Sequence, residues 1–263
     1  MLKKSLVAAI AMIWATPLYA AHPLITDDTG TQGRGRFQFE LNGERSRDRE
    51  TTDGVATTAN RSETAATISY GISDSVDLVA GFPYQWSRQT ENGTVTFDGH
   101  GISDLSLQIK CRLLENRENG LSLAIKPGLS IPSGDERKGF GNGQASGGVV
   151  IIATREDKHC ALHANIGYTR NEYRLEEDRN ALRKDIWHAS LAAVLNVSGK
   201  LRAVTNIGVE TNSDNTSDIA PAFLIGGLIY GVTDNLDIDT GIKGGLNRAE
   251  IDTTLMAGLA VRF

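Results

Sequence analysis

Apolar side chains recur at every second position along most of this chain. In its last nine residues the apolar positions are Leu255, Ala257, Leu259 and Val261, and the chain ends on Phe263. Successive side chains of a strand point to opposite faces, so one face of this segment is apolar and the other is polar or small. A strand of an outer-membrane barrel needs this pattern, because one face meets lipid. A half-buried strand of a soluble protein shows it too, so the pattern alone leaves both structures open.

The same period of two predicts about twelve strands along the chain. They are expected near residues 35–45, 61–71, 76–88, 102–113, 121–131, 145–155, 159–170, 184–197, 201–211, 219–231, 236–247 and 251–263. Each reaches or slightly exceeds the length of about nine to eleven residues that a tilted strand needs to cross a bilayer.

The connections between these strands alternate between short and long. Short turns are expected at 72–75, 114–120, 156–158, 198–200 and 232–235, and longer polar segments at 46–60, 89–101, 132–144, 171–183 and 212–218. Short periplasmic turns opposite long extracellular loops are typical of outer-membrane barrels, whereas a soluble sandwich has no reason to alternate in this way. We therefore predict an all-β fold: a transmembrane antiparallel β-barrel of about twelve strands over residues 35–263.

The N-terminus has the pattern of a secretory signal peptide over residues 1–20. Lys3 and Lys4 precede an apolar run from Leu6 to Trp14, and Ala20 suits cleavage before Ala21. The run is too short to span a bilayer as a helix. Residues 21–34 are expected to form a mobile periplasmic segment that reaches the barrel mouth. We expect export to the outer membrane of a Gram-negative bacterium, with membrane lipid and the barrel insertion machinery as partners and Phe263 as the assembly signal.

Charge and hydropathy narrow the function. The formal net charge of -5 falls to -7 once Lys3 and Lys4 leave with the signal peptide, and no basic stretch is present, so nucleic acid is not an expected partner. A mean hydropathy of -0.23 would ordinarily indicate a soluble protein. A low mean hydropathy does not exclude a membrane barrel, because only alternate strand residues face lipid and the loops are polar.

Three segments have distinctive sequences: Ala21-His-Pro-Leu-Ile-Thr-Asp-Asp-Thr-Gly-Thr-Gln-Gly33, Gly99-His-Gly-Ile-Ser-Asp-Leu-Ser-Leu-Gln-Ile-Lys110 and Ile131-Pro-Ser-Gly-Asp135. Together they resemble the MetA-pathway of phenol degradation family. The resemblance implies a porin-like or transporter-like outer-membrane barrel, in some cases associated with the degradation of aromatic compounds. It supplies no catalytic residues. Cys111 stands where the family usually has an aromatic residue.

Charged residues at inward positions are the candidate channel lining. They are Glu40, Glu44, Asp77, Lys110, Lys126, His163, Arg202, Glu210, Asp237, Asp239, Lys243, Asp252 and Arg262. Such charges either form a polar channel or pair and close a narrow barrel. If loop 132–144 folds inward as a constriction, Arg137 and Lys138 would give it a preference for anions.

The enzymatic alternative rests on His188-Ala-Ser190, whose spacing resembles that of outer-membrane phospholipases. Both polar side chains are expected inside, away from lipid substrate, and no Asn follows Ser190 directly. We therefore expect no catalytic residues, no metal site and no cofactor. The leading hypothesis is a narrow channel or transporter for small aromatic or otherwise hydrophobic solutes. The alternatives are a closed structural or adhesive barrel acting through its loops and, more remotely, a phospholipase. The sequence leaves the oligomeric state open.

Overall fold

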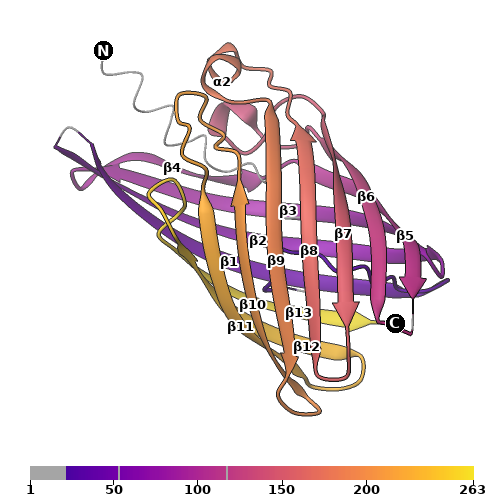
Figure 1. Ribbon diagram of the computed structural model, residues 1–263. Coiled ribbons are helices and arrows are strands. Elements are labelled where there is room, and N and C mark those ends of the chain that lie inside the picture. Colours follow the sequence, from indigo (N-terminus) through magenta and orange to yellow (C-terminus); the bar gives the residue numbers. More distant parts are fainter. Residues whose placement is uncertain (1–21, 53, 117) are drawn as a thin grey trace.

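The computed structural model describes residues 22–52, 54–116 and 118–263, and the predicted signal peptide lies outside these ranges. The described residues form thirteen strands and two short helices (Figure 1). The strands are β1 (Phe37–Thr52), β2 (Val55–Ser73), β3 (Val76–Glu91), β4 (Thr94–Ile102), β5 (Leu105–Asn116), β6 (Leu121–Ile131), β7 (Ser146–Glu156), β8 (Cys160–Arg170), β9 (Asp185–Asn196), β10 (Leu201–Glu210), β11 (Ala222–Gly231), β12 (Leu236–Gly245) and β13 (Thr253–Arg262). The helices are η1 (Glu136–Lys138) and α2 (Glu176–Ala181).

Antiparallel pairing closes the sheet into a barrel. Consecutive strands pair in sequence order, except that β5 pairs with β3 and not with β4, and β1 bonds to β13 to complete the ring. The twelve strands of the ring are β1 to β3 and β5 to β13, while β4 pairs only with the far end of β3. The predicted twelve-stranded antiparallel barrel is confirmed, with one additional strand.

The additional strand, β4, lies within residues that the sequence predicts as a loop. Residues 89–101 contain Asn92-Gly93, and both residues have positive φ, 48° and 83°, so they turn β3 directly into β4. This dipeptide favours a tight hairpin because both central positions of such a turn require positive φ. The predicted loop 46–60 is likewise a hairpin, in which β1 and β2 remain paired out to Thr52 and Val55. Both predicted loops are therefore wrong, and two hairpins extend beyond the ring at that end of the barrel.

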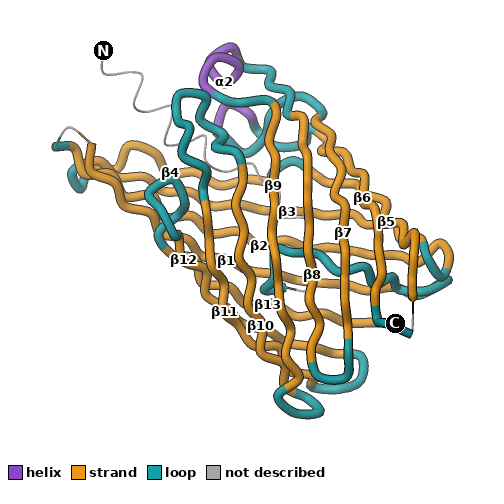
Figure 2. Tube along the Cα trace, viewed as in Figure 1, coloured by secondary structure: helices purple, strands orange, loops and turns teal. Residues whose placement is uncertain are grey.

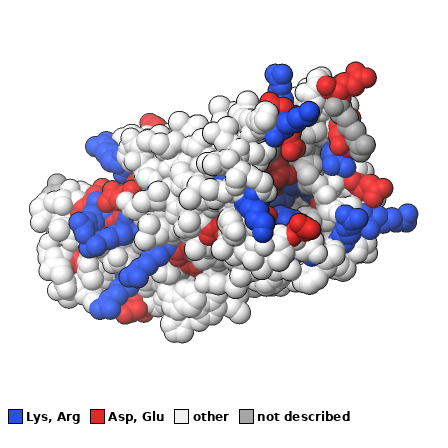
Figure 3. Space-filling view, turned by 90° about the horizontal axis from the view of Figure 1, so that it is seen from below, with Lys and Arg blue, Asp and Glu red and all other residues white. Residues whose placement is uncertain are grey.

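Side chains alternate across the wall as predicted. On β13, Leu255 is 56% exposed whereas Met256 is 4% exposed, and the same alternation runs along β3 and β12. Charged side chains gather toward the two ends of the molecule, and the surface between them is mostly uncharged (Figure 3). Among the described residues no helix is long and apolar enough to cross a membrane. An exposed apolar band of this kind is stable only in contact with lipid.

Aromatic rings mark both edges of the apolar band. Near the short turns Phe37 packs on Tyr70, with ring centroids 4.5 Å apart. Toward the long loops Tyr168 packs on Trp187 at 4.9 Å, and Tyr84 packs on Trp86 at 4.6 Å. Rings with a polar group favour the boundary between lipid and water, so the two sets define the membrane boundaries. The terminal Phe263 is 73% exposed at the short-turn edge, where its backbone pairs with that of Phe37.

Two of the motifs noted in the sequence meet at the long-loop end. The carboxylate of Asp104, in the break between β4 and β5, accepts hydrogen bonds from the backbone N–H groups of Ser133, Gly134 and Asn142 at 2.9–3.1 Å. Phe140, in the same loop, is 1% exposed and packs near Phe97 of β4. Asp104 therefore fixes the loop between β6 and β7 against the β3–β4 hairpin.

Replacing Asp104 with Ala should release this loop. Three backbone N–H groups lose their acceptor, which weakens the closed loop by about 3 kcal/mol. Trypsin cleavage after Arg137 or Lys138 in the folded protein should then become at least tenfold faster, since local opening exposes the backbone to the protease. Asp98→Ala, which removes an exposed carboxylate from β4, is the matched control. Equal cleavage of the two variants would contradict the anchoring role.

Candidate functional site in the barrel lumen

The lumen is occupied by the segment that precedes β1. Residues 22–29 are largely buried inside the ring, and residues 31–34 lie beside the short turn between β2 and β3. Figure 2 shows this loop segment passing among the strands. The expectation of a mobile periplasmic segment over 21–34 is corrected for residues 22–29, because their polar groups find partners on the inner wall. We call residues 22–32 the lumen segment.

Asp27 is the centre of the contacts that hold the lumen segment. Its two carboxylate oxygens each accept a hydrogen bond of 2.8 Å, one from Lys110 of β5 and one from Lys126 of β6. The side chain of Asp27 is 1% exposed, and the Asn165 amide of β8 can bond both the N–H and the carbonyl oxygen of the same residue. Asp28 lies 3.6 Å from Lys110 and is more exposed. One carboxylate thus joins two buried ammonium groups from adjacent strands.

Neutral hydrogen bonds extend this attachment to either side of Asp27. Asn206 of β10 accepts from the backbone N–H groups of Ile25 and Thr26 at 2.8 and 3.0 Å. The Thr26 hydroxyl donates to Ser190 at 2.7 Å, and the N–H of Thr29 donates to Thr154 at 3.2 Å. Further along, the N–H of Gln32 donates to Asp77. The segment is therefore bonded to β3 and to each strand from β5 to β10.

Apolar contacts explain inward residues that break the usual alternation. Strands β7 and β11 are apolar on both faces, and the sequence alone could not assign their inner side. In the structure Leu24 packs against Ala192, Val204 and Ile229, while Ile25 packs against the cluster around Phe223. Ala192, Val204 and Ile229 thus cover the apolar side chain of Leu24, while Phe223 and Ile25 also line the cavity described below.

Close packing of Pro23 requires glycine on the wall. A Cβ atom at Gly227 would lie 2.6 Å from the Pro23 ring, and one at Gly241 would lie 2.8 Å from it. Contacts this short do not occur between real carbon atoms, so any side chain at either position would displace the start of the segment.

The other predicted lining residues form separate groups. Asp237 accepts from Arg202 and Arg262, both at 2.8 Å, near the short-turn end. Lys243 lies 3.1 Å from Glu250. The remaining predicted residues have these positions: His163 bonds Thr154, Asp239 contacts His22, Glu210 faces His188, and Glu40 is 4% exposed on β1. Asp252 instead lies exposed in the loop before β13, where it accepts from the Arg49 N–H, because β13 begins one residue later.

Arg137 and Lys138 lie away from the lumen. Both are exposed on η1, and Lys138 pairs with Asp135 at 3.2 Å. The hydrogen bond from Lys138 lowers the pKa of the Asp135 carboxyl. From the predicted constriction loop, Asn142 is the described residue that lines the cavity.

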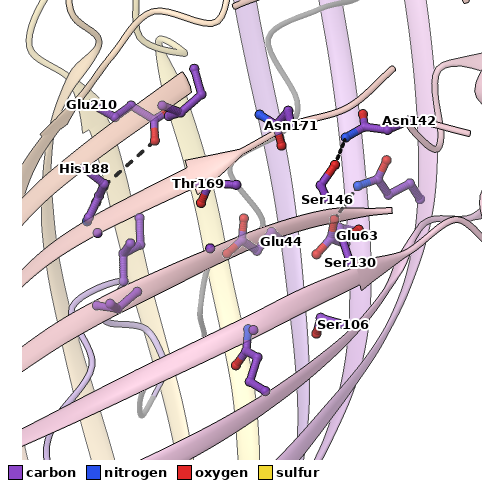
Figure 4. A pocket seen from close by; sticks show the side chains of 18 of the residues that line it. Glu44, Glu63, Ser106, Ser130, Asn142, Ser146, Thr169, Asn171, His188 and Glu210 are labelled. Carbon is purple, nitrogen blue, oxygen red and sulfur yellow. Dashed lines mark hydrogen bonds and ion pairs between the residues drawn. The ribbon is translucent and has the colours of Figure 1, made fainter. Parts of the chain in front are cut away.

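A cavity of about 250 Å³ lies above the lumen segment, toward the long loops. Figure 4 shows polar side chains around it, including Glu44 and Glu63 from β1 and β2 and His188 and Glu210 from β9 and β10. Its apolar lining includes Ile25, Val149, Val150, Ile186, Phe223, Ile251 and Met256. Lys243 lies 5.6 Å from the centre of the Phe223 ring. The cavity thus combines an apolar, aromatic lining with charged groups of both signs.

Of the pair considered for phospholipase activity, His188 lines this cavity and Ser190 lies against the lumen segment. His188 Nε2 lies 3.0 Å from Ser190 Oγ, and His188 Nδ1 lies 3.9 Å from Glu210. Ser190 is 5% exposed, and its oxygen already accepts the Thr26 hydroxyl. A serine engaged in this way attaches the lumen segment and is not presented to a lipid outside the wall.

Asp27→Asn should loosen the lumen segment. The change leaves two buried ammonium groups without their carboxylate, and breaking a buried ion pair from one side costs about 3–5 kcal/mol. We expect faster amide hydrogen exchange over residues 22–30 of the folded protein, because the segment then leaves the wall more often. Asp28→Asn, in the adjacent and more exposed position, should have a much smaller effect. Indistinguishable behaviour of the two variants would show that Asp27 does not hold the segment.

Solved structures with the same fold are outer-membrane barrels. The COG4313 outer membrane channel from Pseudomonas putida F1 is 13% identical, with a TM-score of 0.69 over 90% of this chain and 98% of that one. The NanC porin is 9% identical, with a TM-score of 0.56 over 85% and 98%. The transport unit of the autotransporter AIDA-I from Escherichia coli is 10% identical, with a TM-score of 0.55 over 98% and 97%.

No functionally curated protein matches the sequence significantly. A family model does match, and it covers residues 23–263, from the lumen segment to the terminal phenylalanine. The match therefore includes both the barrel and the segment that occupies it. The chain belongs to the family described as "Putative MetA-pathway of phenol degradation".

Proposed function

We propose that this protein is a narrow outer-membrane channel for small aromatic or otherwise hydrophobic solutes. The observation that carries the proposal is the cavity above the lumen segment, whose apolar side is built around Phe223. Its volume of about 250 Å³ lies just below the range of drug-sized binding pockets. It therefore suits a solute of about one ring.

The chemistry of the cavity supports the same class of solute. Phe223 is 4% exposed, so its ring is held by the wall, and His188 stacks near it with a centroid distance of 6.5 Å. An additional ring would find an aromatic face on one side and hydrogen-bonding groups such as Asn142 and Thr169 on the other. A phenol or a benzoate has one apolar face and one polar group, and it matches this arrangement.

Family membership supports the proposal further. The family description refers to phenol degradation, and the P. putida relative in fold is an outer membrane channel. We extend both to this chain, with residues 1–20 acting as the signal peptide and the outer membrane of a Gram-negative bacterium as the location. The lumen segment then forms the floor of the solute cavity.

Aromatic solutes should block the channel from the long-loop side. Phenol or benzoate added there should interrupt single-channel current of the refolded protein in a planar bilayer. Phe223→Ala should weaken the block roughly threefold to tenfold, since an aromatic pair contributes about 0.5–1.5 kcal/mol.

Phe82→Ala is the matched control, because Phe82 is 45% exposed on the lipid face of β3. It should leave the block unchanged. Open channels whose current neither phenol nor benzoate reduces would contradict the proposed class of solute. A folded barrel without current would instead favour a closed structural barrel that acts through its loops.

A further inference from the structure

The outer face of β1 becomes basic above the apolar band. Arg45, Arg47 and Arg49 occupy alternate positions of β1, and all three are exposed. They continue the outward series of Phe37 and Leu41, which lie in the apolar part of the same strand. Because alternate residues of a strand share a face, the three arginines lie on the outer surface of the barrel and not on its lumen side. One strand thus changes along its length from a lipid-facing apolar surface to a basic one.

Strand register brings a fourth arginine to the same place. Arg47 lies opposite Asn60 of β2, and Asn60 lies opposite Arg88 of β3. Directly opposite residues share a face, and neighbouring strands are about 4.8 Å apart, so the α-carbons of Arg47 and Arg88 flank Asn60 roughly 10 Å from each other. Arg88 is exposed as well. We call Arg45, Arg47, Arg49, Asn60 and Arg88 the outer arginine patch.

The outer arginine patch lies at the membrane boundary on the long-loop side. Ser62 of β2 is opposite both Arg45 and Trp86, so Arg45 is level with one of the rings that mark this boundary. Arg47 and Arg88 are two residues farther along their strands, about 7 Å beyond that level. An arginine on the outer face of a barrel is costly deep in lipid and is tolerated near the interface. Lipid headgroups lie at this level, so the patch faces them.

The protein itself neutralises little of this positive charge. Among the described residues, no carboxylate forms an ion pair with Arg45, Arg47 or Arg49. Arg88 lies 3.8 Å from Asp98 of β4, which is too long for a hydrogen bond, and both side chains are mostly exposed. Four guanidinium groups therefore share one exposed carboxylate, and most of their N–H donors face outward.

The far side of the barrel provides a contrast at the same height. Arg170 of β8 is exposed on the outer face, near the Tyr168 and Trp187 rings that mark the boundary there. Its guanidinium donates to both carboxylate oxygens of Asp185, at 2.9 and 2.7 Å. The charge of Arg170 is thus balanced within the protein, whereas the charge of the outer arginine patch remains for a ligand outside it.

We propose that the outer arginine patch binds the phosphate groups of a phosphorylated glycolipid in the outer leaflet of the membrane. Guanidinium groups match phosphate oxygens in a bidentate manner, so the two arginines that flank Asn60 suit one phosphate between them. Below the patch, Leu41 and Phe82 offer exposed apolar surface to the acyl chains of the same lipid. Charge, height and apolar surface therefore fit one amphipathic anion. The proposal rests on the outer-membrane location and does not depend on any solute in the lumen.

Lipid binding to the refolded mature protein in a neutral detergent tests this proposal. Lipid A is the probe, and titration calorimetry gives its dissociation constant. Arg47→Gln should weaken binding about fivefold, since an arginine near an anionic lipid surface contributes about that much. The triple variant Arg45→Gln, Arg47→Gln, Arg88→Gln should weaken it on the order of a hundredfold. Arg170→Gln is the matched control, because it removes an outer-face arginine that Asp185 already pairs, and it should bind lipid A as the wild type does.

A second comparison uses the wild-type protein alone, so it does not depend on the folding of any variant. Lipid A without its phosphate groups keeps its sugars and acyl chains, and it should bind at least about tenfold more weakly than intact lipid A.

Three results would overturn the proposal. They are a wild-type protein that does not bind lipid A, equal affinity for the lipids with and without phosphate, and a triple variant that binds as tightly as the wild type. None of these measurements involves current through the lumen. Failure here therefore leaves the proposed solute channel standing, and a barrel that passes no solute leaves the lipid site standing.

Discussion

The buried ion pairs of Asp27 with Lys110 and Lys126 determine what the interior of this barrel can be. Two ammonium groups on adjacent strands would repel each other in a lumen of low dielectric, and the lumen segment supplies the carboxylate that neutralises them. Wall and segment are therefore interdependent. The inward apolar residues near Leu24 and the glycines beside Pro23 also indicate that the lumen is filled. The apolar residues contact Leu24, and the glycines leave room for the Pro23 ring.

The exterior of the barrel could be predicted from the sequence because its constraint is local. Lipid contact requires an apolar residue at every second position, so β13 and β12 could be assigned face by face from residues such as Leu255 and Ile238. Polar composition was the weaker guide. It favoured a loop over residues 89–101, although Asn92-Gly93 between strand-forming residues is itself a hairpin signal.

The interior could be predicted only in part. The alternation of side chains along each strand predicts that Lys110, Lys126, Asp237 and Arg262 point inward. Which of these charged groups form ion pairs depends on which segments meet inside the lumen, and the alternation does not give that. Residues 22–32 show no regular alternation of apolar and polar positions, so their sequence does not predict that they fold into the lumen. Their content of Asp, Thr and Pro was compatible with a periplasmic linker. The partners that hold them are far away in the sequence, as with Asn206 and Thr26.

Closure of the ring removes the free strand edges of the sheet, yet β4 restores one beyond the ring. It pairs with β3 on one side and has no second strand partner among the described strands. An unpaired edge can add a strand from another chain, and proteins limit this by keeping such strands short and charged. β4 has nine residues and carries Asp98. A barrel whose ring is sealed against strand exchange therefore keeps, at the nine-residue edge of β4 outside the membrane, a place where its sheet could grow.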